Sequence, residues 1–162
     1  MPLLKKFLSD LSDTNVVVTV PAVLIFKQLS DSVLVARCMS EAEAGFFPVA
    51  TRAIDSYVHA RFTRQPQLKC PMKLIHYSWG RSEDELYMKL KNWGHCNDFD
   101  VETFFARWKE LDDENYKLWK DFHPVQPHNW TDLVKINIKD LSAVDALSLL
   151  AYPSGAPHRH LS

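Results

Sequence analysis

Three side chains that could bind a ligand lie close together in the middle of the sequence. His76 and Tyr77 end a short apolar segment, and Arg81 comes directly before Ser82. An imidazole can bind a metal or a phosphate group, and a guanidinium pairs with anions. We expect His76 and Arg81 to face one open cleft at the carboxyl end of a strand, beside the N–H groups of the following helix. Such a positive corner would suit a diphosphate.

Both residues also have a purely structural explanation. His76 could be a corner histidine that hydrogen-bonds to the backbone. Arg81 could pair with Glu83 or Glu85 in the first turn of the helix, which would contribute only a few tenths of a kcal/mol. The residue types alone leave these alternatives open.

Aromatic residues are concentrated between His76 and Trp130, a stretch that contains 12 of the 19 in the chain. Phe104 and Trp108 have helical spacing, which predicts a place in the core. Trp79 and Trp130 instead flank turns, so we expect both to be more exposed than Trp108. A flat aromatic face on a loop can stack on a sugar ring while nearby polar groups bind its hydroxyls.

Two aspartates, Asp98 and Asp100, have the Asp-x-Asp spacing that can hold a divalent metal. They also stand directly before a helical pattern, where aspartate commonly caps the helix, and we favour this interpretation. No hydrolase motif is present, and the four glycines form no glycine-rich phosphate cradle.

The composition is that of an ordinary globular protein, with 46% hydrophobic and 24% charged residues and a formal net charge of −1. This charge gives no reason to expect nucleic acid as the main partner. The most apolar stretch, Val16–Phe26, is too short to cross a bilayer, so we predict no transmembrane segment. Three cysteines without CxxC spacing argue against a disulfide framework and indicate a reducing, cytoplasmic location.

The residue patterns along the chain predict an α+β domain over residues 1–152, with short strands packed against several helices, and a mobile tail over 153–162. Ser82 begins a helix with a capping box, and alternation places Leu74 and His76 on one strand face, with Ile75 on the other. The patterns predict helices over 3–11, 47–62, 82–94 and 98–111 and from 142, and strands over 16–20, 23–26, 33–38, 73–77 and 134–138.

Two segments resemble the C-terminal part of family-2-like glycosyltransferases with the GT-A fold. In that family, a strand that ends in His-Tyr is followed by Arg-Ser or Lys-Ser and by a helix with an acidic first turn and a central lysine. The similarity covers roughly residues 45 to 136. The matching residues are His76, Tyr77, Arg81, Ser82, Glu83, Glu85 and Lys89, and then Phe122, His123, Pro124, Pro127 and Trp130.

The resemblance implies transfer of a sugar from a nucleotide-sugar donor to a glycan acceptor, assisted by a divalent metal (Mn or Mg), with His76 as a metal ligand. Nothing before residue 45 resembles the nucleotide-binding half of that family. We therefore expect the chain to be the acceptor-side portion of such an enzyme. We expect no sugar transfer by the chain alone, and the sequence does not identify a catalytic base. The predicted substrate-binding residues are His76, Tyr77, Trp79, Arg81, Lys89 and Trp130.

The alternative is a non-catalytic interaction domain. In this interpretation the loop aromatics form a surface that binds a protein or a glycan. The sequence indicates neither the donor sugar nor the oligomeric state.

Overall fold

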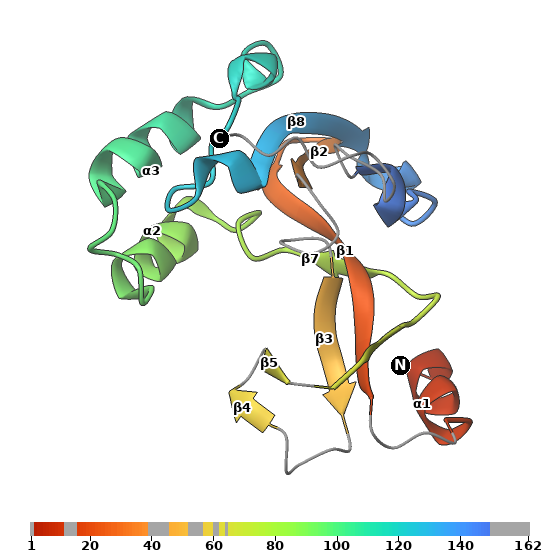
Figure 1. Cartoon of the computed structure of the whole chain (residues 1–162). Coiled ribbons are helices and arrows are strands. Elements are labelled where there is room, and N and C mark those ends of the chain that lie inside the picture. The colour runs from red at the N-terminus through yellow and green to blue at the C-terminus, as the bar shows by residue number, and fades with distance from the viewer. Residues whose placement is uncertain are drawn as a thin grey trace, which may run out of the picture.

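Figure 1 shows a computed structural model of the chain, which describes residues 2–11, 16–38, 46–51, 57–59, 62–63 and 65–149. The architecture is α+β, as predicted. The helices are α1 (Pro2–Ser9), α2 (Glu83–Asn92) and α3 (Val101–Glu110), with short 3-10 helices η3 (Tyr116–Leu118), η4 (Pro127–Asn129), η5 (Ile138–Asp140) and η6 (Ala146–Leu149). The strands are β1 (Val17–Gln28), β2 (Ser32–Cys38), β3 (Phe46–Thr51), β4 (Tyr57–His59), β5 (Phe62–Thr63), β6 (Gln67–Lys69), β7 (Leu74–His76) and β8 (Trp130–Asn137).

β1 is the central strand of a six-stranded sheet. Its first half pairs antiparallel with β3 and parallel with β6, and its second half pairs antiparallel with β2 and parallel with β7. β8 continues the sheet beyond β2. Pro21 lies where the pairing with β3 ends and that with β7 begins, which suits a residue without an N–H group. The two strands predicted on either side of Pro21 are therefore one strand.

The second half of β1 separates two cores. Leu24 and Phe26 belong to a core that α2 and α3 cover, whereas Val23 and Ile25 face the opposite core, which contains Leu149 of η6. Figure 1 shows α2 and α3 on one side of this part of the sheet and the C-terminal turns on the other. The two-residue period of a strand accounts for this division.

Phe26 is the centre of the aromatic core beneath α2 and α3. It is 1% exposed, and aromatic rings surround it in stacked, tilted and edge-to-face arrangements. Such pairs add roughly 0.5–1.5 kcal/mol each beyond the area that they bury. The rings with centroids between 4.8 and 6.4 Å from that of Phe26 are Trp79, Phe104, Trp119, Phe122 and Trp130.

Lys27 attaches the carboxyl end of α3 to β1. Its Nζ donates hydrogen bonds to the carbonyl oxygens of Trp108 at 2.8 Å and Leu111 at 2.6 Å. The Trp108 indole in turn donates to the carbonyl of Phe26 at 3.0 Å. The last carbonyls of a helix lack intrahelical partners, so a cation is a favourable cap for them. Partial burial lowers the pKa of Lys27.

The helix predicted over 47–62 is wrong. The described parts of this region are β3, β4 and β5, and β3 pairs with β1 from Val17 opposite Thr51 to Pro21 opposite Phe46. Short apolar runs fit both the helical and the strand period, and the backbone groups of β1 need a partner. Tertiary pairing therefore overrides the helical spacing.

The capping predictions are confirmed. Ser82 and Glu85 form the capping box at the start of α2, and Asp100 caps α3 by accepting a hydrogen bond from the Thr103 amide at 3.0 Å. The final helix is predicted to begin at Ser142, but residues 142–145 are not helical, and the segment forms only the short 3-10 helix η6. The tail predicted over 153–162 lies outside the described residues.

Candidate functional site

β7 ends at the residues that the sequence singled out. It runs parallel to β1, with His76 opposite Leu24. Leu74 packs with the aromatic core and Ile75 with the opposite core, so the side chains alternate as predicted. Tyr77 is the first residue after the strand, and the chain then turns into α2.

The turn after β7 lies very close to β1 at Gly80. A Cβ atom added to Gly80 would be 2.5 Å from Cγ2 of Ile25 and 3.3 Å from the Tyr77 ring. A separation of 2.5 Å is shorter than any normal contact between carbon atoms. A residue without a side chain therefore lets the turn approach the sheet and sets the position of Tyr77.

Two cations hold the carbonyl group of Ser78 within this turn. Lys89 donates to the Ser78 carbonyl at 2.8 Å and also to the Ser78 hydroxyl, and Arg81 Nε donates to the same carbonyl at 3.2 Å. The Lys89 ammonium lies 4.3 Å from the centroid of the Trp79 ring. Lys89 thus stabilises the turn through Ser78 and Trp79.

A cleft of about 660 Å³ lies between the β1–β2 hairpin and the start of α2. The Tyr77 side chain is 40% exposed there. In the described part of the chain, neither the Tyr77 hydroxyl nor the Gln28 amide has a hydrogen-bond partner, and Arg81 uses only Nε. The lining residues are Gln28, Leu29, Tyr77, Gly80, Arg81, Ser82 and Glu85.

The start of α2 is acidic. Glu83, Asp84 and Glu85 form its first turn, and Glu85 Oε2 accepts hydrogen bonds from the Ser82 hydroxyl at 2.8 Å and the Ser82 amide at 3.2 Å. These bonds, and more weakly the charge of Arg81, lower the pKa of Glu85. The expected positive corner is therefore absent, because Arg81 and Glu85 both line the cleft and their opposite charges offset each other.

His76 does not share the cleft with Arg81. Its ring centroid lies 5.1 Å from that of Phe47 on β3, its side chain is partly buried, and it is not among the lining residues. The structure thus brings together Tyr77 and Arg81 but leaves His76 beside the strand pair β1–β3.

Trp79 and Trp130 are core residues. They are 7% and 5% exposed, against 2% for Trp108, and their rings meet edge to face at 5.2 Å. The predicted order of exposure holds, but the inference that these tryptophans are available at the surface is wrong. Although both flank turns, they pack against Phe26, which lies far away in the sequence.

The described residues do not fit a complete site for the divalent metal that the resemblance implies. Among them, no three His, Cys, Asp or Glu side chains lie close enough to share an ion, whereas Mg²⁺ and Mn²⁺ favour several oxygen ligands. Asp100 is the cap of α3, and Asp98 pairs with His95 at 2.7 Å. No step of the proposed function is therefore assigned to a metal ion.

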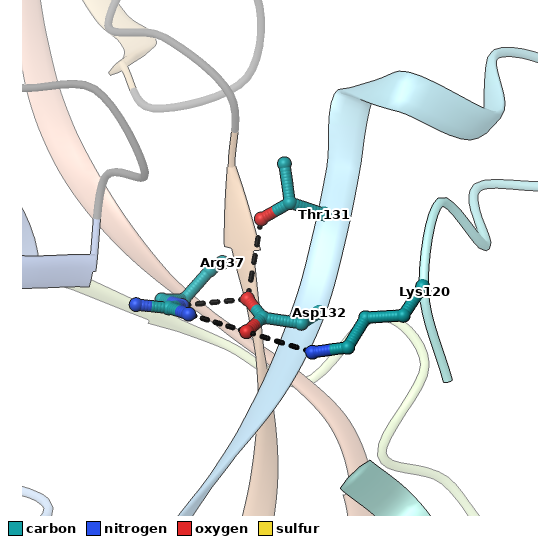
Figure 2. Close-up of polar contacts among 4 residues, drawn as sticks. All are labelled: Arg37, Lys120, Thr131 and Asp132. Atoms are coloured by element: carbon teal, nitrogen blue, oxygen red, sulfur yellow. Dashed lines mark hydrogen bonds and ion pairs between the residues drawn. The ribbon is translucent and has the colours of Figure 1, made fainter. Parts of the chain in front are cut away.

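A second polar group lies on the sheet at β2 and β8, and Figure 2 shows its four residues, here called the Asp132 cluster: Arg37, Lys120, Thr131 and Asp132. Arg37 binds both carboxylate oxygens of Asp132, through Nε at 2.6 Å and through a terminal nitrogen. Lys120 Nζ and the Thr131 hydroxyl also donate hydrogen bonds to the Asp132 carboxylate, at 3.3 Å and 3.2 Å. The bonds from Arg37 lower the pKa of Asp132.

Sequence reasoning missed part of the cleft. Gln28 and Leu29 reach it only because β1 pairs with β7, and no local pattern announces that pairing. Glu85 was recognised as a member of the capping box, but its second carboxylate oxygen faces no partner within the described residues. The sequence indicates that Glu85 can accept hydrogen bonds, but it does not indicate that Glu85 lies in the cleft.

Comparison with known proteins leaves the family open. No family model, no curated protein and no solved structure matches the chain. None of the described helices is long and apolar enough to cross a membrane. The function is therefore argued from the cleft and from the sequence resemblance.

Proposed function

We propose that this chain is the acceptor-side, C-terminal portion of a glycosyltransferase that moves a sugar from a nucleotide-sugar donor to a glycan acceptor, and that its cleft binds the glycan. The observation that carries the proposal is the meeting of Tyr77 and Arg81 in one cleft. The resemblance around the same two residues supplies the reaction class. The volume of the cleft, about 660 Å³, falls within the roughly 300–1,000 Å³ that is common for small-ligand sites.

Each polar group of the cleft has a role in this proposal. The Tyr77 ring stacks on the apolar face of a sugar, and its hydroxyl is free to bond. Arg81 donates hydrogen bonds, Glu85 accepts them, and the Gln28 amide does both. Lys89 acts indirectly, because it holds the Ser78 carbonyl to which Arg81 also binds.

The same cleft supports a second candidate, a glycan-binding domain without catalysis. An exposed aromatic ring beside donors and acceptors is sufficient to hold a sugar, and the one carboxylate that lines the cleft, Glu85, is a weak base because its bonds to Ser82 lower its pKa. A measurement of sugar transfer separates the two candidates, because only the enzyme would show turnover. Sequencing of the reading frame upstream of Met1 adds a further test, since a strand followed by an Asp-x-Asp block would favour the enzyme.

The proposal is tested by binding to a glycan array, followed by titration of the strongest ligand. We expect Tyr77→Ala and Arg81→Ala each to weaken binding by about 10-fold or more, which corresponds to about 1.4 kcal/mol. Leu118→Ala is the control for a lost exposed side chain, and Lys139→Ala is the control for a lost positive charge. Both residues are exposed and lie outside the cleft.

A panel of nucleotide sugars is then tested with the bound glycan as acceptor. We expect no transfer by the chain alone, and transfer when a donor-binding half is present in the same polypeptide. Absence of any glycan binding, or binding that survives both cleft substitutions, contradicts the proposal. Binding without transfer in any longer form of the protein favours the second candidate.

A further inference from the structure

The charged residues around the cleft indicate which charge its ligand can carry. We infer that it takes an uncharged sugar and rejects anionic ligands, both acidic sugars and the diphosphate of a donor. This inference rests on the proposed function and narrows it to one class of glycan. It follows from three observations on the residues that surround Tyr77.

The first observation is the balance of charge. Arg81 is the only cation among the residues that line the cleft, and Glu85 on the same wall offsets it. Glu83 and Asp84 belong to the same helical turn but do not line the cleft, so their charges act on a bound anion only through space. Lys109 neutralises Glu83 only partly, through an exposed contact of 3.2 Å. An anion beside Arg81 would therefore stand beside the Glu85 carboxylate, with the two further carboxylates of the turn acting from outside the cleft.

The second observation is that α2 already caps itself. The Glu85 amide donates to the Ser82 hydroxyl at 3.4 Å, and the Ser82 amide donates to the Glu85 carboxylate at 3.2 Å. Helix N-termini bind phosphate through amide groups that lack partners. Here the Ser82 and Glu85 amides already have partners within the turn, so the helix offers an anion fewer amide donors than an uncapped helix would.

The third observation is the mixture of donors and acceptors. A sugar hydroxyl both donates and accepts, and the cleft provides Arg81 as donor, Glu85 as acceptor, and Tyr77 and Gln28 as both. A phosphate or carboxylate only accepts. It would satisfy Arg81 and leave the second carboxylate oxygen of Glu85 without a donor from the ligand, whereas an uncharged diol can bond to both.

The test uses the purified 162-residue chain. An array with neutral and acidic glycans identifies the strongest neutral ligand. That glycan, its counterpart with a uronic acid in place of the terminal hexose, and uridine diphosphate are then titrated at the same ionic strength. We expect the neutral glycan to bind about 10-fold or more tightly than either anion, in a Tyr77-dependent manner.

The double variant Glu83→Gln/Asp84→Asn removes two charges and leaves the capping box intact. It should reduce the discrimination against the uronic acid by several-fold, and added salt should reduce it in the wild type. The double variant Glu114→Gln/Asp140→Asn removes two exposed charges outside the cleft and should have no such effect.

The outcomes separate the two proposals. Equal or tighter binding of the uronic acid or of uridine diphosphate at the Tyr77-dependent site overturns this inference and leaves glycan binding intact. Unchanged discrimination in Glu83→Gln/Asp84→Asn also overturns it, because the carboxylates would then not be the cause. Failure to bind any glycan overturns both this inference and the proposed function.

Discussion

The cleft and the Asp132 cluster use similar side chains in opposite ways. In the Asp132 cluster, both oxygens of one carboxylate are occupied by Arg37, Lys120 and Thr131, and the Asp132 side chain is only 14% exposed. In the cleft, Arg81 and Glu85 do not pair through a direct salt bridge, and the Tyr77 hydroxyl has no partner among the described residues.

This difference separates structural from functional polar groups. Charges that satisfy one another contribute to the stability of the fold, and little of their bonding capacity remains for a ligand. Groups that keep unused bonding capacity beside an exposed ring contribute little to stability and can bind a ligand. Substitutions in the Asp132 cluster should therefore change stability alone, and substitutions in the cleft should mainly change binding.

The largest effect is expected for Asp132→Ala. The change leaves Arg37 and Lys120 without their shared partner, so the free energy of unfolding should fall by about 2 kcal/mol, measured by urea denaturation. Glycan binding should not change. The control is Asp113→Ala, which breaks the exposed ion pair with Lys135 and should change the free energy of unfolding much less than Asp132→Ala does. A loss of glycan binding in Asp132→Ala would remove the distinction between the two regions.

Gly80→Ala should affect both properties. The new Cβ would collide with Ile25, so we expect a loss of about 1–2 kcal/mol and weaker glycan binding, since the turn that carries Tyr77 must shift. Gly94→Ala is the matched control, because a Cβ there meets nothing within 4 Å. If both variants were equally stable, the close approach of the turn to β1 would be disproved.

Lys89→Met should have a smaller effect. It removes the bonds to Ser78 and the contact with the Trp79 ring but keeps a long apolar side chain, so we expect a loss of about 1 kcal/mol and several-fold weaker binding. Lys89→Arg should restore most of the binding. Lys91→Met, which breaks an exposed ion pair with Glu102, is the control. Unchanged binding in Lys89→Met would exclude a positional role.

The effect of pH concerns His123, outside both regions. Burial, with a smaller contribution from His95, lowers its pKa from 6.5 to about 4. Between these values the unfolded chain binds more protons than the folded one, so the free energy of unfolding should fall as the pH falls from about 6.5 to about 4. The contribution of Asp132 should be lost only below its ordinary pKa of 3.8.

The control for His123 is His123→Asn. It retains an acceptor for the amides of Val125 and Gln126 but cannot titrate, so stability should depend less on pH in this window. Urea denaturation of both proteins at several pH values measures the difference. Parallel slopes would show that another group causes the pH dependence.

The sequence predicts those features that depend on neighbouring residues. The capping box at Ser82, the cap at Asp100 and the strand predicted over 73–77, which the structure shows at Leu74–His76, all follow from local patterns. The failures depend on pairing between distant segments. Residues 46–51 form a strand because β1 needs a partner, and Trp79 is buried because Phe26 lies beneath it.

The most direct test of the account is a titration of the isotopically labelled chain with the strongest neutral glycan, followed by amide chemical shifts. The account predicts saturable shifts that are largest at Gln28, Leu29 and the stretch from Tyr77 to Glu85, with none at Arg37 or Asp132. Shifts concentrated in the Asp132 cluster, or the absence of any saturable shift, would contradict it.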